Sequence, residues 1–115
     1  GVERTALVTD SLACAAADSD VAFDPRVVLE DGVCKLADRS ALAGSVATLK
    51  DCVKNMYKTV GVPLYDAVRM ATLTPAEVIG FNKTKGKIEK GYDADFVLFD
   101  DDINIKTVIT NGNII

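Results

Sequence analysis

The segment Thr5-Ala-Leu-Val-Thr-Asp10 decides how this chain is interpreted. A short apolar run that contains β-branched residues is typical of a buried strand, and this run ends on a carboxylate. Barrel enzymes hold their catalytic side chains at the carboxyl ends of such strands. The segment therefore predicts a buried strand that presents Asp10 at its tip as a candidate catalytic residue.

The composition limits what can accompany Asp10 within this sequence. The chain has 115 residues and contains no histidine. A catalytic carboxylate usually works beside a histidine-held metal or a histidine base. We therefore expect part of an active site, with no metal ligand and no cofactor bound by this chain alone. The chain starts at Gly1-Val2 without a methionine, and we expect it to be a fragment of a longer protein.

Charge and cysteine content exclude several classes of function. The chain is 49% hydrophobic and 26% charged, which is ordinary for a globular protein, and its net charge is -4. Nucleic acids and anionic membranes attract basic patches, and no run of Lys or Arg is present, so we expect neither partner. Cys14, Cys34 and Cys52 have no ligand spacing, which predicts buried, reduced thiols in a cytoplasmic protein.

Hydrophobic periodicity predicts a loop, a hairpin and then helices in the first 80 residues. Residues 11–20 are small and without period, as in a loop over the strand tip. Asp31-Gly32 between apolar runs favours a type I′ turn, and hence a β-hairpin over 27–36. A helix is expected from Val46 to Val60, with Thr48 and Asp51 as a capping box, before Gly61.

Two more helices follow in the sequence. The first is predicted over Leu64–Ala71, and the second begins at Thr74-Pro75, with Thr74 as its cap, and ends at Gly80. The predicted buried stripe of the first consists of Leu64, Ala67, Val68 and Ala71. We expect these helices to be scaffold.

The character changes after Phe81 to turns and short β segments. Strands are expected at 87–91, 96–99, 105–110 and 114–115, and Asn111-Gly112 is a strong hairpin signal. The carboxylates of 93–95 and 100–102 are predicted to be turn residues, because they lack the ligand spacing of a calcium loop. The predicted domains are residues 1–80, with the inserted hairpin, and residues 81–115.

Four motifs carry a resemblance when they are read in order. They are Val8-Thr-Asp10, Leu42-Ala-Gly-Ser45, Met70-Ala-Thr-Leu-Thr-Pro-Ala76 and Gly86-Lys-Ile-Glu-Lys-Gly-Tyr-Asp-Ala-Asp-Phe-Val-Leu-Phe-Asp100. The chain resembles the C-terminal part of the N-acetylglucosamine-6-phosphate deacetylase family, in the amidohydrolase superfamily. The last motif is specific only to the superfamily, and the first two narrow the resemblance to the sugar-phosphate deacetylases.

The resemblance implies an α/β fold and a hydrolase of amino sugar and carbohydrate metabolism. It implies a metal-dependent (β/α)8 barrel, of which Thr5–Asp10 is the last strand, with outer helices and a small β-sandwich to which residues 88–115 contribute. The implied enzyme is a cytoplasmic homodimer that removes the acetyl group from N-acetylglucosamine 6-phosphate. Zinc or a similar divalent ion would be held by residues upstream of Gly1, so the lone chain is predicted to be inactive.

The resemblance also assigns the candidate site residues. Asp10 would be the catalytic acid and base, because hydrolysis of an amide needs an activated water and a protonated leaving amine. Leu42, Ala43 and Gly44 would form the substrate-binding loop, where small residues let main-chain groups approach the sugar. Their alternative interpretation is a turn before a helix, with Ser45 as a cap.

Two other functions stay open at this stage. Another metal-dependent amidohydrolase, for example a dihydroorotase-like enzyme, shares the last motif, and a substrate panel on the intact protein would separate it. A non-catalytic remnant that acts as an interaction module is the other alternative, and the encoding gene would distinguish it. A single barrel strand has no partner in the lone chain, so we expect the isolated chain to dimerise, to swap strands or to fold differently from its place in the whole enzyme.

Overall fold

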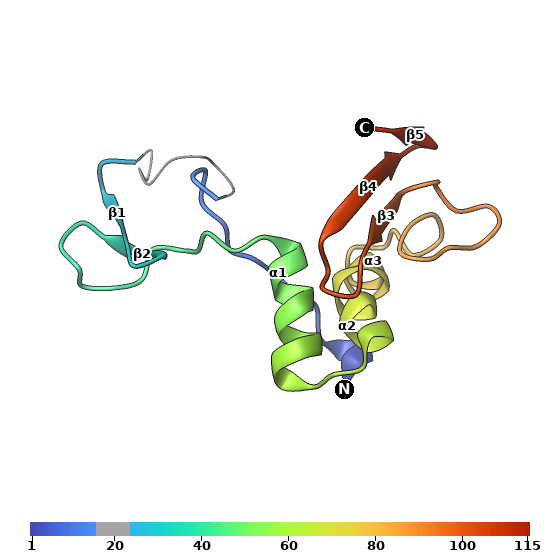
Figure 1. Ribbon diagram of the computed structural model, residues 1–115, viewed down its shortest axis with the longest axis horizontal. Coiled ribbons are helices and arrows are strands. Elements are labelled where there is room, and N and C mark those ends of the chain that lie inside the picture. Colours follow the sequence, from blue (N-terminus) through green and yellow to red (C-terminus); the bar gives the residue numbers. More distant parts are fainter. Residues whose placement is uncertain (16–23) are drawn as a thin grey trace. The chain divides into compact units, whose positions relative to one another are not determined.

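The computed structural model describes residues 1–15 and 24–115 of the chain (Figure 1). The chain forms two compact units, which we call unit 1, Gly1–Leu7 with Val53–Ile115, and unit 2, Val8–Cys52. The predicted division into residues 1–80 and 81–115 stays a prediction. Of the predicted loop at 11–20, residues 16–20 lie outside the described residues.

Unit 2 contains the predicted hairpin. Strands β1 (Val27–Glu30) and β2 (Val33–Leu36) pair antiparallel. Their register places Glu30 opposite Val33, as a two-residue turn requires. Asp31 and Gly32 have φ values of 53° and 73°. Positive φ at both central residues is the signature of a type I′ turn, so the hairpin prediction is confirmed.

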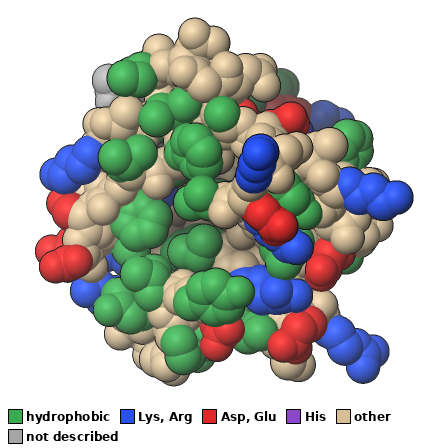
Figure 2. Space-filling view, turned by 90° about the vertical axis from the view of Figure 1, so that its right-hand side faces the viewer, with side chains coloured by type: hydrophobic (Ala, Val, Ile, Leu, Met, Phe, Trp, Pro, Cys, Tyr) green, Lys and Arg blue, Asp and Glu red, His purple; other side chains and the backbone are tan. Residues whose placement is uncertain are grey.

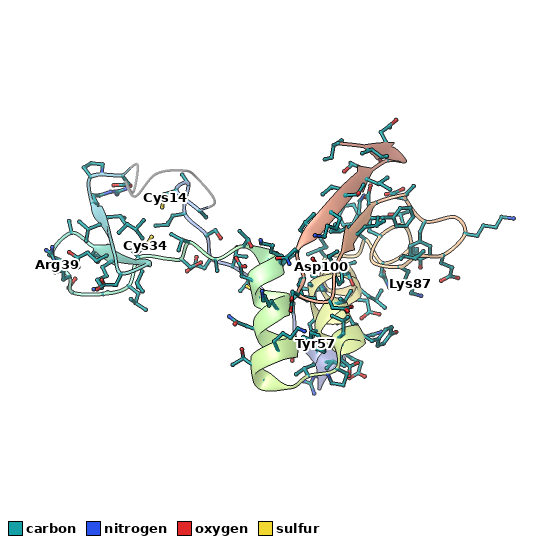
Figure 3. All side chains as sticks on the ribbon, viewed as in Figure 1. Cys14, Cys34, Arg39, Tyr57, Lys87 and Asp100 are labelled. Carbon is teal, nitrogen blue, oxygen red and sulfur yellow. The ribbon has the colours of Figure 1, made fainter. Side chains whose placement is uncertain are left out.

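The core of unit 2 is built on two cysteines. Cys14 and Cys34 are buried, and their sulfur atoms lie 4.0 Å apart (Figure 3). This separation is well beyond a disulfide bond, and both thiols are free. Partly buried apolar residues pack around them, namely Leu12, Val27, Leu29 and Val46. Both cysteines therefore fill space as small apolar side chains, as expected, whereas Cys52 is only half-buried.

The segment Thr5–Asp10 does not form the predicted buried strand. No residue from 5 to 10 belongs to a strand, and Val8 is 78% exposed. A strand exists through its hydrogen bonds to a neighbour, and no strand of the described residues pairs with this segment. The prediction was wrong for this chain because β propensity supplies an extended backbone but not a pairing partner.

The first predicted helix starts at residue 49. Helix α1 (Leu49–Lys54) continues into η2 (Asn55–Val60), whose turns are π-helical, and Gly61 ends it with a φ of 83°. The backbone N–H and the hydroxyl of Thr48 both donate to Asp51 Oδ2, at 3.0 and 2.5 Å. Of the predicted capping box, the half in which the carboxylate reaches back is present, whereas the Thr48 hydroxyl donates to Asp51 and accepts no backbone N–H of the described residues.

In unit 1, α2 (Leu64–Ala71) and α3 (Leu73–Val78) pack against each other and against the 3₁₀ turn η1 (Val2–Arg4). The bounds of α2 are as predicted, but Ala67 is the only residue of its expected buried stripe that is fully buried. Met70, which lies outside that stripe, is buried as well. Thr74 does not cap α3. It lies within the helix, is buried, and donates its hydroxyl to the carbonyl of Val2 at 3.0 Å. Because its hydroxyl is bonded to the Val2 carbonyl, Thr74 does not cap the helix.

The C-terminal part of unit 1 is an antiparallel sheet in the order β3-β4-β5 (Phe96–Phe99, Ile105–Thr110 and Asn113–Ile114). Positive φ at Asn111 and Gly112 forms the predicted hairpin turn. The predicted strand at 87–91 was wrong, because Gly86 and Gly91 adopt φ values of 91° and 95° and turn the chain at both ends.

Many apolar side chains of the chain face solvent. On the face shown in Figure 2, hydrophobic side chains gather into a broad patch beside scattered charges. In unit 1, large exposed side chains include Val78, Ile88, Ile114 and Ile115. Among the described residues, no helix combines the length and the hydrophobicity that a membrane span requires.

Candidate active site

Asp10 lies in unit 2 with a backbone conformation that is uncommon for a residue other than glycine. Its φ is 50°, in the left-handed region, where Asp is tolerated better than most residues. The side chain is exposed. The carboxylate therefore lies in solvent, where a substrate could reach it. The backbone on both sides of Asp10 is held by hydrogen bonds.

Residues 44–47 hold the backbone around Asp10. The N–H of Ser45 donates to the carbonyl of Asp10 at 2.8 Å, and the Ser45 hydroxyl donates to the carbonyl of Thr9 at 2.5 Å. In return, the N–H of Leu12 donates to the Ser45 carbonyl at 2.9 Å. Ser11 and Ser45 thereby form a parallel bridge. Asp10 is thus fixed by a second segment that is more than 30 residues away in sequence.

The structure brings the predicted substrate loop to Asp10. Gly44 has a φ of 95°, and a Cβ placed on it would lie 2.9 Å from the Asp10 carbonyl oxygen. Ala43 donates its N–H to Cys34 in β2, and Leu42 forms a bridge with Lys35 of the same strand. Leu42 is 72% exposed. The hairpin thus supports the loop from one side, and Gly44 lies against Asp10 on the other.

A hollow of about 410 Å³ lies beside this loop. Its lining is mostly apolar and comes entirely from unit 2. The lining residues are Gly32, Val33, Leu42, Gly44, Ser45, Val46, Ala47 and Asp51. Asp10 is not among them, but its backbone carbonyl contacts two of the lining residues, Gly44 and Ser45.

The described residues do not fit a metal centre. Residues 1–15 and 24–115 contain no group of three or more His, Cys, Asp or Glu side chains that could hold an ion, and the sequence has no histidine. Burial raises the pKa of the Cys34 thiol, which works against the thiolate that a metal or a substrate would need. Neither a ligand set nor a nucleophilic cysteine is found in this part of the chain.

The remaining acidic clusters organise turns, as expected. Lys85 lies 2.9 Å from Asp93 and 2.6 Å from Asp95, and its hydrogen bond holds the pKa of the Asp95 carboxyl below its ordinary value. Asp100 accepts hydrogen bonds from the side chain and N–H of Asn104 and pairs with Lys106, and these contacts lower its pKa too. These carboxylates tie the loops around β3 and β4.

Ser45 is the one residue at the site whose role differs from the sequence expectation. Its alternative interpretation was a helix cap, but at the start of α1 it is the Asp51 carboxylate that accepts the N–H and hydroxyl of Thr48. The Ser45 hydroxyl instead accepts the N–H of Ala47 at 3.1 Å and donates to Thr9. Its place at the end of Leu42-Ala-Gly-Ser45 was the available signal, but nothing local in the sequence indicates a contact with residue 9.

Comparison with known proteins covers nearly the whole chain. The model of the family described as "Amidohydrolase family" matches residues 4–115. The chain is 31% identical over 114 residues to N-acetylglucosamine-6-phosphate deacetylase from Haemophilus influenzae, covering 96% of the chain and 30% of that protein. It is 33% identical over 116 residues to N-acetylgalactosamine-6-phosphate deacetylase from a Shewanella species, covering 100% of the chain and 29% of that protein.

A solved structure matches the fold closely. The crystal structure of N-acetylglucosamine-6-phosphate deacetylase from Pasteurella multocida superposes with a TM-score of 0.90 at 34% identity. The match covers 97% of this chain and 30% of that one. The chain therefore spans less than a third of the length of each of these proteins.

Proposed function

This chain belongs to the amidohydrolase family, and from that premise we propose that the intact protein hydrolyses the acetamide of N-acetylglucosamine 6-phosphate. The products would be glucosamine 6-phosphate and acetate. The observation that carries the proposal is the likeness to the Pasteurella multocida deacetylase, with a TM-score of 0.90 over 97% of the chain at 34% identity. In the proposal, residues 1–80 form the C-terminal part of the barrel of the intact protein, and β3–β5 join the small sandwich.

Asp10 is the proposed proton carrier of this reaction. Neutral amides resist hydrolysis because water is a poor nucleophile and an amide anion is a poor leaving group. The Asp10 carboxylate would take a proton from the attacking water and return it to the departing nitrogen. Its exposed side chain and fixed backbone support this role, because a proton carrier needs both access and a defined position.

Leu42, Ala43 and Gly44 are the proposed substrate-binding residues. Gly44 lies against the Asp10 carbonyl, so a sugar held by this loop would have its acetamide near the carboxylate. Exposed Leu42 and the adjoining hollow would provide apolar contact with a sugar face, and main-chain groups at Gly44 can approach closely because no Cβ intervenes.

The amidohydrolase superfamily is generally metal-dependent, and we propose zinc or a similar divalent ion for the intact protein. The described residues of this chain do not fit such a site, so the proposal places the ligands outside it. The isolated chain is accordingly expected to lack activity. A cytoplasmic location is part of the proposal, supported by three free cysteines, and so is a homodimer.

A second candidate substrate is N-acetylgalactosamine 6-phosphate. The Shewanella relative that bears this name is 33% identical over the whole chain, as similar as the glucosamine enzymes. The two sugars differ in the orientation of a single hydroxyl group, which a site reads through individual hydrogen bonds. A cyclic amide of the dihydroorotase type is the more distant alternative.

The test is deacetylation by the intact gene product, supplied with zinc, on the two 6-phosphosugars and a cyclic amide. We expect the glucosamine substrate to be preferred. Asp10→Asn should lower kcat by about two to four powers of ten while metal content and thermal unfolding stay unchanged. Asp31→Asn, at the exposed hairpin turn, is the matched control. A native protein inactive on both sugars would overturn the proposal.

A further inference from the structure

We infer that Ser45 is a positioning residue for Asp10, acting through the backbone of residues 9–12. This inference rests on the proposed function, in which Asp10 carries the proton. The set of hydrogen bonds that joins residues 9–12 to residues 45–47 is called the clamp below. Within it Ser45 contributes the most bonds, through its N–H, its carbonyl and its hydroxyl.

The clamp holds the chain on both sides of Asp10. Before Asp10, the carbonyl of Thr9 accepts the Ser45 hydroxyl at 2.5 Å. At Asp10, the carbonyl accepts the Ser45 N–H at 2.8 Å. After Asp10, the Leu12 N–H reaches the Ser45 carbonyl at 2.9 Å, and the Ser11 hydroxyl donates to the carbonyl of Ala47. Two successive peptide groups are thus fixed, and with them the direction of the Asp10 Cα–Cβ bond.

The left-handed conformation of Asp10 makes such a clamp necessary. A non-glycine residue with a φ of 50° is less stable than one in the extended region, and it persists only where its surroundings determine it. Two adjacent carbonyls bound to one serine provide that determination. The direction of the carboxylate depends on this φ value, so a relaxed backbone would move it.

The Ser45 hydroxyl both donates and accepts a hydrogen bond at the clamp. It donates to Thr9 and accepts the N–H of Ala47 at 3.1 Å, which leaves it in one orientation. Ser45 itself is only half-buried and lines the hollow, so a slightly larger side chain has room. Removing the hydroxyl would free the Thr9 carbonyl but leave the backbone bond to Asp10, and the fold of unit 2 would persist.

Small displacements of a proton carrier have large effects on rate. A shift of about 1 Å in a catalytic group can cost about 100-fold, because proton transfer requires hydrogen-bond distance. We therefore expect Ser45→Ala to lower kcat by about 10- to 100-fold with KM changed less than about twofold. Ser45→Thr keeps the hydroxyl and should return kcat to within about threefold of native.

The experiment compares these variants in the intact gene product with zinc and N-acetylglucosamine 6-phosphate. Ser40→Ala is the matched control, because Ser40 is an exposed serine of the same unit whose hydroxyl donates to Asp38 at 2.7 Å. Thermal unfolding and metal content are measured for each variant. Where Ser45→Ala does not fold, Ser45→Cys replaces it with the same expectation.

A double variant separates action through Asp10 from an independent effect. In the Asp10→Asn background, Ser45→Ala should lower the residual rate no further, because residues that act as a unit are not additive. A further 10-fold loss there would overturn the inference, and so would a Ser45→Ala protein as active as native. Both results differ from failure of the proposed function, in which native protein itself is inactive.

Discussion

The two units of the chain hold their residues in place by different means. Unit 1 is stabilised by regular elements, with Ala67, Met70 and Leu73 buried between short helices. Unit 2 has a two-stranded hairpin and a core of two cysteines, and its candidate site consists of irregular segments joined by hydrogen bonds. Asp10 and Gly44 both adopt positive φ there.

This difference distinguishes unit 1, which is mainly scaffold, from unit 2, which holds the candidate site. Packed helices tolerate change on their exposed faces, because their stability comes from buried apolar area. A site built from loops depends on individual hydrogen bonds and on the absence of single atoms, such as a Cβ at residue 44. Substitutions in unit 1 should therefore act on stability, whereas substitutions in the clamp should act on activity.

The largest expected effect on stability is in unit 1. Met70 is 2% exposed, so Met70→Ala should lower the free energy of unfolding by about 2 to 5 kcal/mol through lost burial and a cavity. Activity per folded molecule should stay near native. Urea unfolding and steady-state kinetics of the intact product measure both, and Val78→Ala, at a position that is 76% exposed, is the control. A kcat per folded molecule well below native in Met70→Ala would contradict the assignment of unit 1 to the scaffold.

The next largest expected effect, on both stability and activity, is that of a substitution at Gly44. A Cβ there would lie 2.9 Å from the Asp10 carbonyl oxygen, and the φ of 95° is strained for any other residue. Gly44→Ala should cost about 1 to 2 kcal/mol in unfolding and, unlike Met70→Ala, lower kcat strongly. Gly61→Ala is the control, because its φ is 83° but nothing lies within 4 Å of the new Cβ. Equal losses of activity in both variants would argue against the close contact as the cause.

The smallest expected effect is on the stability of the protein at low pH. Hydrogen bonds from Asn104 and the ammonium of Lys106 hold the pKa of Asp100 below 3.8, its ordinary value. A lowered carboxyl pKa in the folded state contributes stability that is present above about pH 4 and is lost as pH falls through the folded value. The urea concentration at the unfolding midpoint should therefore decrease as the pH is lowered below about 4. This decrease should be less steep in Asp100→Asn than in Asp101→Asn. Identical slopes in the two variants would exclude Asp100 as the source.

Local chemistry made several elements predictable. Asp31-Gly32 and Asn111-Gly112 formed the hairpin turns that their preference for positive φ indicates, and α2 has its predicted bounds. The chain also carries the family resemblance in its motifs, and the match of the family over residues 4–115 confirms it. These features depend on neighbours in sequence, so sequence patterns report them.

Features that depend on distant partners were not predictable in the same way. Thr74 was expected to cap α3, but its hydroxyl donates a hydrogen bond to the carbonyl of Val2. The segment Thr5–Asp10 was expected to be a strand, but no strand of the described residues pairs with it. Asp10 was identified as a candidate, but the part played by Ser45 was not. The local pattern around each of these residues was consistent with the expectation, and the partner that changed the outcome lies far along the chain.

The hairpins, the bounds of α2, the family and the choice of Asp10 as the candidate proton carrier all follow from the amino-acid sequence. The contacts of Gly44 and Ser45 with the Asp10 backbone, and the meeting of the Cys14 and Cys34 thiols in one core, follow only from the folded structure. The physical reason is range. Turn and helix preferences arise within a few residues, whereas a hydrogen bond between residues 10 and 45 exists only after folding has brought the two segments together.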